Sequence, residues 1–306
     1  MSVLFILVGL VGLLLGGEAL VRGAVSIAER FRISPMVIGV TLVGFGTSTP
    51  ELVTSLQAAF AGAPGIAVGN VIGSNIANIL LILGGAAALS PIVVKAHEFR
   101  RDGAALVVGT LIGTALILTG QIGLVGGGLL VAALIAYLVF TLANGAQEDA
   151  PEDTVAMHPG LAALFVIGGL AITIFSAGLL VDGAVDIAAR LGVSEAVIGL
   201  TIVAVGTSLP ELVTSIAAAR KGQSALALGN VLGSNLFNLL GILGITALVH
   251  PLEVPAEILA FDIWVMLAAT AALCLVAITG WRVTRGEGVA LVAAYAAYLA
   301  ALVPLA

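Results

Sequence analysis

The feature that most constrains this chain is a match between its two halves at an offset of 160 residues. GTSTPELVTS at 46–55 returns as GTSLPELVTS at 206–215. Between 33–84 and 193–244, 30 of the 52 aligned positions are identical, without a gap. Such self-similarity indicates that one structural unit occurs twice.

Composition places this unit in a membrane. Of the 306 residues, 60% are hydrophobic and 9% are charged, whereas an ordinary soluble domain carries about 25% charged residues. The apolar runs are long and continuous, which favours helices over the alternating strands of a membrane β-barrel. We therefore predict an all-α integral membrane protein surrounded by the lipid bilayer. Soluble enzymes and nucleic-acid binders are excluded, so no nucleic-acid partner is expected.

Polar residues divide the chain into ten apolar segments. A helix needs about 20 residues to cross the hydrocarbon core of a bilayer, which is about 30 Å thick. The ten predicted transmembrane helices are 2–28, 34–61, 65–89, 103–119, 122–144, 160–188, 194–219, 224–248, 257–279 and 286–305.

The basic residues indicate the orientation. If the N-terminus is outside, nine of the eleven Lys and Arg residues fall in inward-facing connections, which is the usual charge bias of membrane proteins. We therefore expect a multi-pass protein of the plasma (inner) membrane with both termini outside. The nine residues are Arg30, Arg32, Lys95, Arg100, Arg101, Arg220, Lys221, Arg282 and Arg285.

Five helices per half is an odd number, so the second half enters the membrane from the opposite side. We predict one membrane domain made of two inverted five-helix repeats, 1–144 and 160–306, joined by a cytoplasmic acidic linker at 145–159. Inverted repeats are typical of secondary transporters that alternate access around a site near the bilayer midplane.

Glu51 and Glu211 lie about halfway along the second and seventh segments, in the same ten-residue frame. An ionisable side chain at that depth costs a few kcal/mol or more, so it marks a functional site by default. Two carboxylates related by a pseudo-two-fold axis would meet near the centre, where their mutual repulsion requires cations.

Pro50 and Pro210 immediately precede these glutamates. A proline inside a helix removes the hydrogen bond to the carbonyl four residues earlier. We therefore expect helix breaks that turn backbone oxygens toward a cavity. The hydroxyl residues beside the two breaks, which supply further oxygens, are Thr47, Ser48, Thr207 and Ser208.

A second repeated motif, GNVIGSNIAN at 69–78 and GNVLGSNLFN at 229–238, places polar side chains four residues apart on one helix face. We favour a ligand role for Ser74, Asn78, Ser234 and Asn238. A ligand role and a packing role stay open for Asn70, Asn75, Asn230 and Asn235. Because neither motif contains His or Cys, all the candidate metal-binding atoms are oxygens. Oxygen ligands select hard cations such as Ca²⁺, Na⁺, Mg²⁺ or Mn²⁺.

At these motifs the sequence resembles the cation/Ca²⁺ exchanger superfamily, most closely its prokaryotic Na⁺/Ca²⁺ exchangers. GTSTPEL with GNVIGSNIAN is similar to the family's first repeat, and GTSLPEL with GNVLGSNLFN to its second. The likeness covers nearly the whole chain. It implies ten helices, an inverted duplication, an outside N-terminus, and first and sixth helices that slide past the rest to expose the site alternately.

The resemblance also implies residue roles. Ca²⁺ would be held by Glu51 and Glu211 with the carbonyls of Thr47 and Thr207. Na⁺ would occupy overlapping sites that combine those glutamates with four serines, and two asparagines would complete the central position. These side chains are Ser48, Ser208, Ser74, Ser234, Asn78 and Asn238. The carbonyls of Gly44 and Ala204 are additional candidates.

One position separates branches of the family. Where K⁺-dependent exchangers carry an aspartate in the second repeat, this chain has Asn238, which argues against K⁺ co-transport. Since 145–159 occupies the place of the large regulatory insert of animal exchangers, regulation by such domains is not expected.

The leading hypothesis is an electrogenic antiporter that exchanges Na⁺ for Ca²⁺ by alternating access, with Ca²⁺ and Na⁺ as its substrates and no cofactor. The alternative is a Ca²⁺/H⁺ antiporter, which needs only the carboxylates. A channel would usually gather its glutamates from symmetric subunits. With every His outside the central stripe, an enzyme with a buried nucleophile and base is not expected. The pattern is compatible with a monomer.

Overall fold

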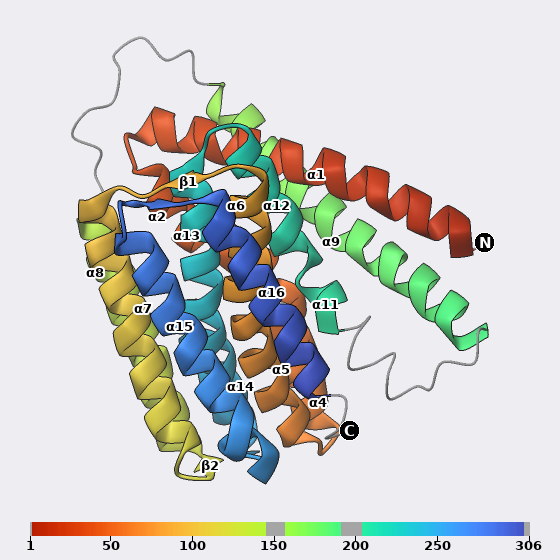
Figure 1. Ribbon diagram of the computed structural model, residues 1–306, viewed down its shortest axis with the longest axis vertical. Coiled ribbons are helices and arrows are strands. Elements are labelled where there is room, and N and C mark those ends of the chain that lie inside the picture. The colour runs from red at the N-terminus through yellow and green to blue at the C-terminus, as the bar shows by residue number, and fades with distance from the viewer. Residues whose placement is uncertain (1, 145–156, 191–203, 303–306) are drawn as a thin grey trace.

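The computed structural model describes residues 2–144, 157–190 and 204–302, and nearly all of them are helical (Figure 1). Most of the predicted linker at 145–159 and the start of the predicted segment 194–219 lie outside these ranges. The α-helices are α1 (Ser2–Phe31), α2 (Pro35–Ile38), α3 (Gly44–Thr47), α4 (Thr49–Phe60), α5 (Pro64–Ala77), α6 (Gly84–Leu89), α7 (Ala96–Ile117), α8 (Leu124–Ala143), α9 (Pro159–Arg190), α11 (Ala204–Thr207), α12 (Leu209–Arg220), α13 (Ser224–Leu236), α14 (Leu243–Val249), α15 (Ile263–Ile278) and α16 (Arg285–Leu302).

Short π-helical turns interrupt several of these helices, and two-residue strands join some of their ends. The π-helical turns are η1 (Gly39–Val43), η2 (Asn78–Leu83), η4 (Phe237–Ile242) and η5 (Ile258–Asp262). The strands are β1 (Ile92–Val93), β2 (Gln121–Ile122), β3 (Leu252–Glu253) and β4 (Arg282–Val283).

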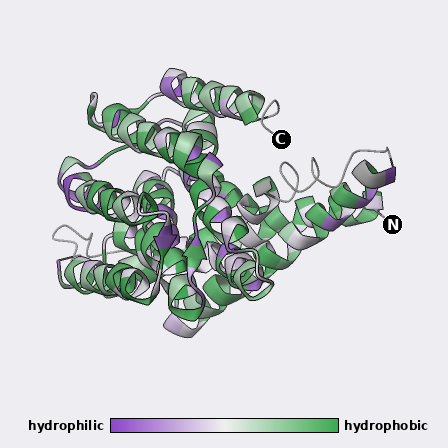
Figure 2. Ribbon diagram, turned by 90° about the horizontal axis from the view of Figure 1, so that it is seen from below, coloured by the Kyte–Doolittle hydropathy of each residue, from purple (hydrophilic) through white to green (hydrophobic). Residues whose placement is uncertain are grey.

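Six helical elements of the described chain are long and apolar enough to span a membrane, or seven if the bent pair Pro35–Thr47 and Thr49–Phe60 counts as one span. Most of the helical ribbon in Figure 2 has the colour of hydrophobic residues. A multi-pass helical membrane protein is therefore confirmed, and ten crossings stay a prediction. The six elements are Ser2–Phe31, Pro64–Leu89, Leu124–Ala143, Pro159–Ile187, Ser224–Val249 and Ile258–Ile278.

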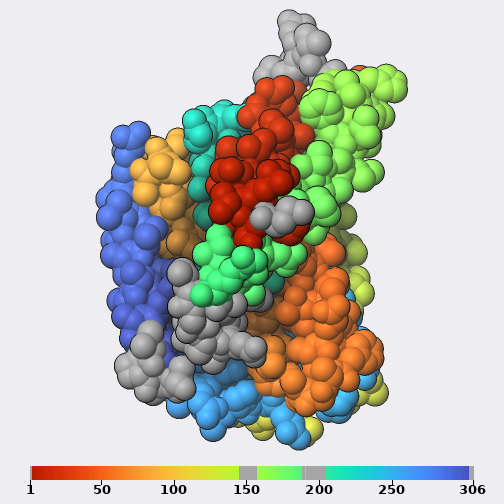
Figure 3. All heavy atoms as spheres, turned by 90° about the vertical axis from the view of Figure 1, so that its right-hand side faces the viewer, coloured from red at the N-terminus to blue at the C-terminus, as the bar shows by residue number. Residues whose placement is uncertain are grey.

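Helices α1 and α9 form an inclined pair on one face of the molecule (Figures 1 and 3). Gly9 of α1 lies against Ser176 of α9, and Gly23 lies against Ala162, so the two helices run antiparallel. Glycines at such contacts let helix backbones approach closely, which is how helices associate in lipid. These two helices correspond to the predicted first and sixth segments.

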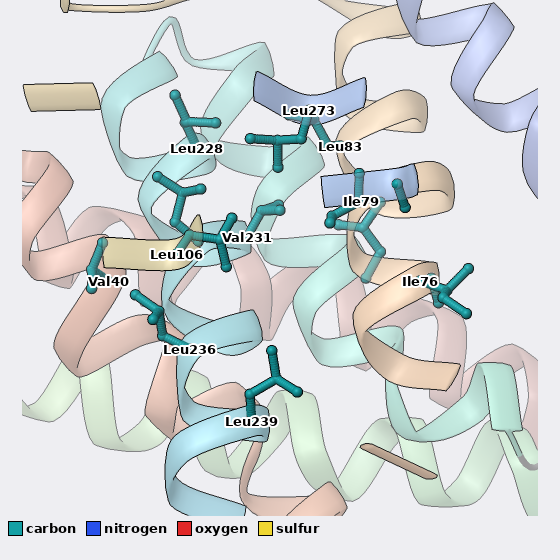
Figure 4. Packing of buried hydrophobic residues seen from close by; sticks show 14 of the residues in the cluster. Val40, Ile76, Ile79, Leu83, Leu106, Leu228, Val231, Leu236, Leu239 and Leu273 are labelled. Carbon is teal, nitrogen blue, oxygen red and sulfur yellow. The ribbon is translucent and has the colours of Figure 1, made fainter. Parts of the chain in front are cut away.

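The core of the molecule surrounds α13, which carries the second GNVLGSN motif. Leu228, Val231 and Leu236 of this helix pack among buried residues of several other helices (Figure 4). The half-helix Pro35–Thr47 lies directly on α13, because a Cβ on Gly229 would come within 2.5 Å of the carbonyl oxygen of Met36. The repeated glycines therefore bring these two backbones together.

This close packing predicts that Gly233→Ala destabilises the protein, since the added methyl group would overlap the carbonyl of Val40. Overpacking a well-packed interior costs about 1–3 kcal/mol, so the purified variant is expected to unfold several degrees below wild type. Gly128→Ala on α8 is the matched control, because no described atom lies within 4 Å of its added methyl group. Equal thermal stability of the two variants would contradict the close contact.

Four short strands were not anticipated by the all-α prediction. β1 pairs antiparallel with β4, and β2 pairs antiparallel with β3. The two pairs lie at opposite ends of the molecule, β1 at the top of Figure 1 and β2 at the bottom. β1 and β3 occupy equivalent positions in the sequence repeat, at the offset of 160 residues. Equivalent parts of the two halves thus lie at opposite ends.

The predicted start of the fourth segment, at 103, is wrong. α7 begins at Ala96 and runs through the charged stretch that was assigned to a loop. Asp102 is fully buried and forms an ion pair with Arg101 at 2.8 Å. Tyr137 of α8 donates a further hydrogen bond to Asp102. A buried charge is tolerated when it is paired in this way, so the helix can start among charged residues.

Candidate ion-binding site

The candidate site begins at two helix breaks. Ser48 separates α3 from α4 and has a ψ of 9°, outside the helical range, and the two flanking segments meet at a bend of 44°. Ser208 separates α11 from α12 in the same way. Pro50 and Pro210 then occupy the first turns of α4 and α12, where a missing N–H is tolerated. Each break thus starts a new helix immediately before a glutamate.

Glu51 and Glu211 follow in these first turns, and each is only 1% exposed. Among the described residues, neither carboxylate forms an ion pair with a lysine or arginine. A buried carboxylate without a charged partner is costly unless a cation accompanies it. The pair of glutamates therefore provides two negative charges that basic side chains in the described part of the chain do not neutralise.

The serines of the two breaks bind the glutamates of the opposite halves. Ser48 donates a hydrogen bond from Oγ to Oε1 of Glu211 at 2.8 Å, and Ser208 donates one to Oε1 of Glu51 at 3.2 Å. These residues are more than 150 positions apart in the chain. The exchange of partners brings both breaks and both carboxylates into one centre.

Asn70 and Asn230 attach each glutamate's backbone to the neighbouring helix. Nδ2 of Asn70 donates to the carbonyl of Glu51 at 3.2 Å, and Nδ2 of Asn230 donates to the carbonyl of Glu211 at 3.3 Å. The same amide groups bond Ser55 at 3.0 Å and Ser215 at 2.9 Å. The amide nitrogens of Asn70 and Asn230 thus join neighbouring helices, and both the ligand role and the packing role stay open for these two residues.

Four buried oxygens on four of the predicted ligands have no hydrogen-bond partner in the described part of the chain. They are Oε2 of Glu51, Oε2 of Glu211, Oδ1 of Asn78 and Oδ1 of Asn238. Buried polar atoms are nearly always paired, so each exception requires an explanation. Carboxylate and amide oxygens are ligands of hard cations, so all four are atoms that could bind one.

Other predicted residues lie beside this centre but already have partners. Thr47 is fully buried, and its hydroxyl has two acceptors within reach for its one proton, the carbonyl of Val43 at 3.0 Å and Oδ1 of Asn230 at 3.3 Å. Ser234 donates to the carbonyl of Gly44 at 3.2 Å. That carbonyl also accepts from Ser48 N at 3.2 Å, so its lone pairs are engaged here.

A cavity of about 380 Å³ lies beside α5. Ser74 and Thr207, two of the predicted ligands, line it together with Asn70. Asp262 and Tyr298 line it as well and are joined by a hydrogen bond of 2.8 Å. Ala204 begins α11, three residues before Thr207.

Ser55 and Ser215 belong to the site but were not among the residues predicted from the sequence. Both are fully buried and complete the links between Asn70 or Asn230 and the glutamate helices. The signal was present, because both serines end the repeated PELVTS motif. Residues before each glutamate were predicted as ligands, whereas these serines lie one turn after it.

Comparison with known proteins agrees with the resemblance that the sequence motifs indicated. A family model described as sodium/calcium exchanger protein matches residues 1–143 and 161–303. The putative antiporter CaxA of Alkalimonas amylolytica is 40% identical over 97% of both chains. The sodium/calcium exchanger MaX1 of Methanosarcina acetivorans is 36% identical over 98% of this chain and 97% of its own.

The fold matches solved structures too. The sodium-calcium exchanger NCX_Mj, soaked with 2.5 mM Na⁺ and 0.1 mM Ca²⁺, superposes with a TM-score of 0.87 at 35% identity, over 98% of both chains. The predicted likeness to prokaryotic Na⁺/Ca²⁺ exchangers is confirmed. The chain therefore belongs to the sodium/calcium exchanger protein family, and it is a transporter and not an enzyme.

Proposed function

We propose that this protein is a secondary active antiporter that exchanges Na⁺ for Ca²⁺ by alternating access. Its family supports cation/Ca²⁺ exchange, and the proposal adds Na⁺ as the coupling ion. The observation that carries it is the set of four unpartnered buried oxygens on Glu51, Glu211, Asn78 and Asn238. The two carboxylates supply negative charge where the helix breaks of both halves meet, and the two amides supply neutral oxygens.

Charge balance explains how one site can serve both ions. Two carboxylates neutralise one Ca²⁺ or about two Na⁺, so full occupancy by one species excludes the other. The serine hydroxyls that bond the carboxylates, from Ser48 and Ser208, are further oxygen ligands for Na⁺. Proton coupling would need the carboxylates alone, so this surrounding set of oxygens favours Na⁺.

We also propose that transport is electrogenic and independent of K⁺. If three Na⁺ exchange for one Ca²⁺, one net charge crosses per cycle, which is worth about 2.3 kcal/mol per 100 mV. Asn238 supplies a neutral amide where K⁺-dependent exchangers have a carboxylate, so this position adds no third negative charge to the site for K⁺.

The architecture proposed for this function is ten crossings in two inverted repeats, 1–144 and 160–306. The positions of β1 and β3 at opposite ends of the molecule support the inversion. The acidic segment 145–159 would then be a cytoplasmic linker and both termini would be outside. Thr47, Thr207, Ser74 and Ser234 would complete the ion sites around the central four, with the carbonyl of Ala204 at their edge. The carbonyl of Gly44 would join them only after losing its hydrogen bond from Ser234.

An ion-substitution experiment tests the coupling ion. The purified protein is reconstituted into vesicles, and Ca²⁺ uptake is followed while the Na⁺, K⁺ and H⁺ gradients are varied separately. We expect uptake to require an opposing Na⁺ gradient, to respond to membrane voltage and to be unchanged by K⁺.

Two outcomes would contradict this proposal. Uptake that survives collapse of the Na⁺ gradient but stops when the proton gradient is collapsed would identify the Ca²⁺/H⁺ antiporter instead. Unitary currents in a planar bilayer would identify a channel. Empty vesicles and vesicles with Glu51→Gln protein serve as the background controls.

A further inference from the structure

A pair of asparagine amides joins the two halves beside the candidate site. Asn75 of α5 is 1% exposed, and its Oδ1 accepts a hydrogen bond of 3.1 Å from Nδ2 of Asn238. Nδ2 of Asn75 faces the main-chain carbonyl oxygen of Asn235 at 3.4 Å and Sδ of Met266 at 3.9 Å. The Asn75 amide is therefore held at both its oxygen and its nitrogen.

The carbonyl of Asn235 sets the direction of both amides. A carbonyl oxygen only accepts hydrogen bonds, so Asn75 must turn its NH₂ group toward it and its own oxygen toward Asn238. Asn238 must then present its NH₂ group to Asn75. This leaves Oδ1 of Asn238 on the other side of its amide, where it is buried and has no partner among the described residues.

We propose that Asn75 is a positioning residue that holds Asn238 with its amide oxygen facing the transported ion. This inference rests on the function proposed above and specifies how one ligand of that site is oriented. Asn75 thereby receives a positioning role, where the sequence pattern was compatible with either a ligand role or a packing role. The arrangement requires a hydrogen-bond donor at position 238, which an amide supplies and an ionised carboxylate does not.

The Asn75–Asn238 hydrogen bond has no equivalent from Asn235, the matching residue of the other half, so Asn235 can serve as a control position. Asn235 occupies the position equivalent to Asn75 in the repeat and is also 1% exposed. Its Nδ2, however, donates to the carbonyl of Val231 in its own helix at 2.7 Å. Replacing the Asn235 side chain leaves its main-chain carbonyl in place, so Asn75 and Asn238 keep their partners.

The test measures equilibrium binding of Ca²⁺ to the purified full-length protein in detergent. Asn75→Leu removes the acceptor for Asn238, whose amide can then rotate. A lost hydrogen bond to a ligand of this kind corresponds to roughly a five- to tenfold weaker Kd for Ca²⁺. The same weakening is expected of Asn75→Ala, which adds no bulk and serves if the leucine variant does not fold. Asn235→Leu should bind Ca²⁺ within about twofold of wild type.

A double-mutant cycle separates positioning from general packing. If Asn75 acts through Asn238, then Asn75→Leu causes no further loss of Ca²⁺ affinity in an Asn238→Leu background. Wild-type affinity in both Asn75 variants, or equal losses in the two backgrounds, would overturn the inference while leaving the proposed function intact. Absence of Ca²⁺ binding by the wild-type protein would overturn both.

Discussion

Replacing either buried carboxylate, by Glu51→Gln or Glu211→Gln, is expected to abolish Ca²⁺ exchange while the protein stays folded and inserted. Each glutamate is buried and offers one oxygen that the described residues leave unpartnered. Glutamine keeps the size of the side chain and can still accept the hydrogen bond from Ser48 or Ser208. It removes one of two negative charges, so the site can no longer neutralise Ca²⁺.

The expected magnitude follows from the cost of breaking a buried charge pair. Removing one partner costs about 3–5 kcal/mol, which corresponds to roughly a hundredfold to several thousandfold in affinity. Reconstituted vesicles should therefore show Ca²⁺ uptake at the background level. Size-exclusion profiles and yields of the variants should match wild type, since the glutamate side chains accept one serine bond each and no ion pair within the described chain.

Glu253→Gln is the matched control, because Glu253 lies exposed in β3. This substitution changes the net charge by the same amount as Glu51→Gln or Glu211→Gln. The Glu253 variant should exchange Ca²⁺ at the wild-type rate. Near-normal transport in either the Glu51 or the Glu211 variant would contradict the assignment of the site to these residues.

The predictions that succeeded depended on features with a long sequence signal. Continuous apolar runs indicated a helical membrane protein, and the duplicated motifs indicated the exchanger family. The start of α7 was predicted wrongly because a run of charges usually marks a loop. In the folded chain Asp102 is instead buried, paired with its neighbour Arg101 and bonded by Tyr137 of α8. A partner such as Tyr137, on another helix, is invisible in a local pattern.

Contacts within the candidate site could not be predicted from local sequence for the same reason. Sequence spacing placed Ser48 and Glu51 in one motif, yet Ser48 donates its hydrogen bond to Glu211 of the other half. Spacing also could not distinguish Asn75 from Asn235, although one amide bonds across the halves and the other bonds within its own helix. Contacts between repeats depend on how two helices are placed against each other, which neither repeat encodes alone.

Asn238→Asp is expected to reduce exchange strongly in neutral buffer and to recover on acidification. In the structure Nδ2 of Asn238 donates to Oδ1 of Asn75. An ionised carboxyl has no proton to donate, so it would face the Asn75 oxygen as a second acceptor and would add a third negative charge to the site. Protonation would restore both the donor and the total of two charges, so activity should rise as pH falls.

The measurement is the ratio of variant to wild-type Ca²⁺ uptake at each pH, because the ratio removes the pH dependence that both proteins share. We expect the ratio to start roughly tenfold below unity, the effect of about 1.4 kcal/mol, and to increase steadily in more acidic buffer. A ratio independent of pH would contradict the requirement for a donor at position 238. K⁺-stimulated uptake by the variant would show instead that the added carboxyl stays ionised and recruits a further cation, so that the neutral amide of Asn238 is what keeps K⁺ out.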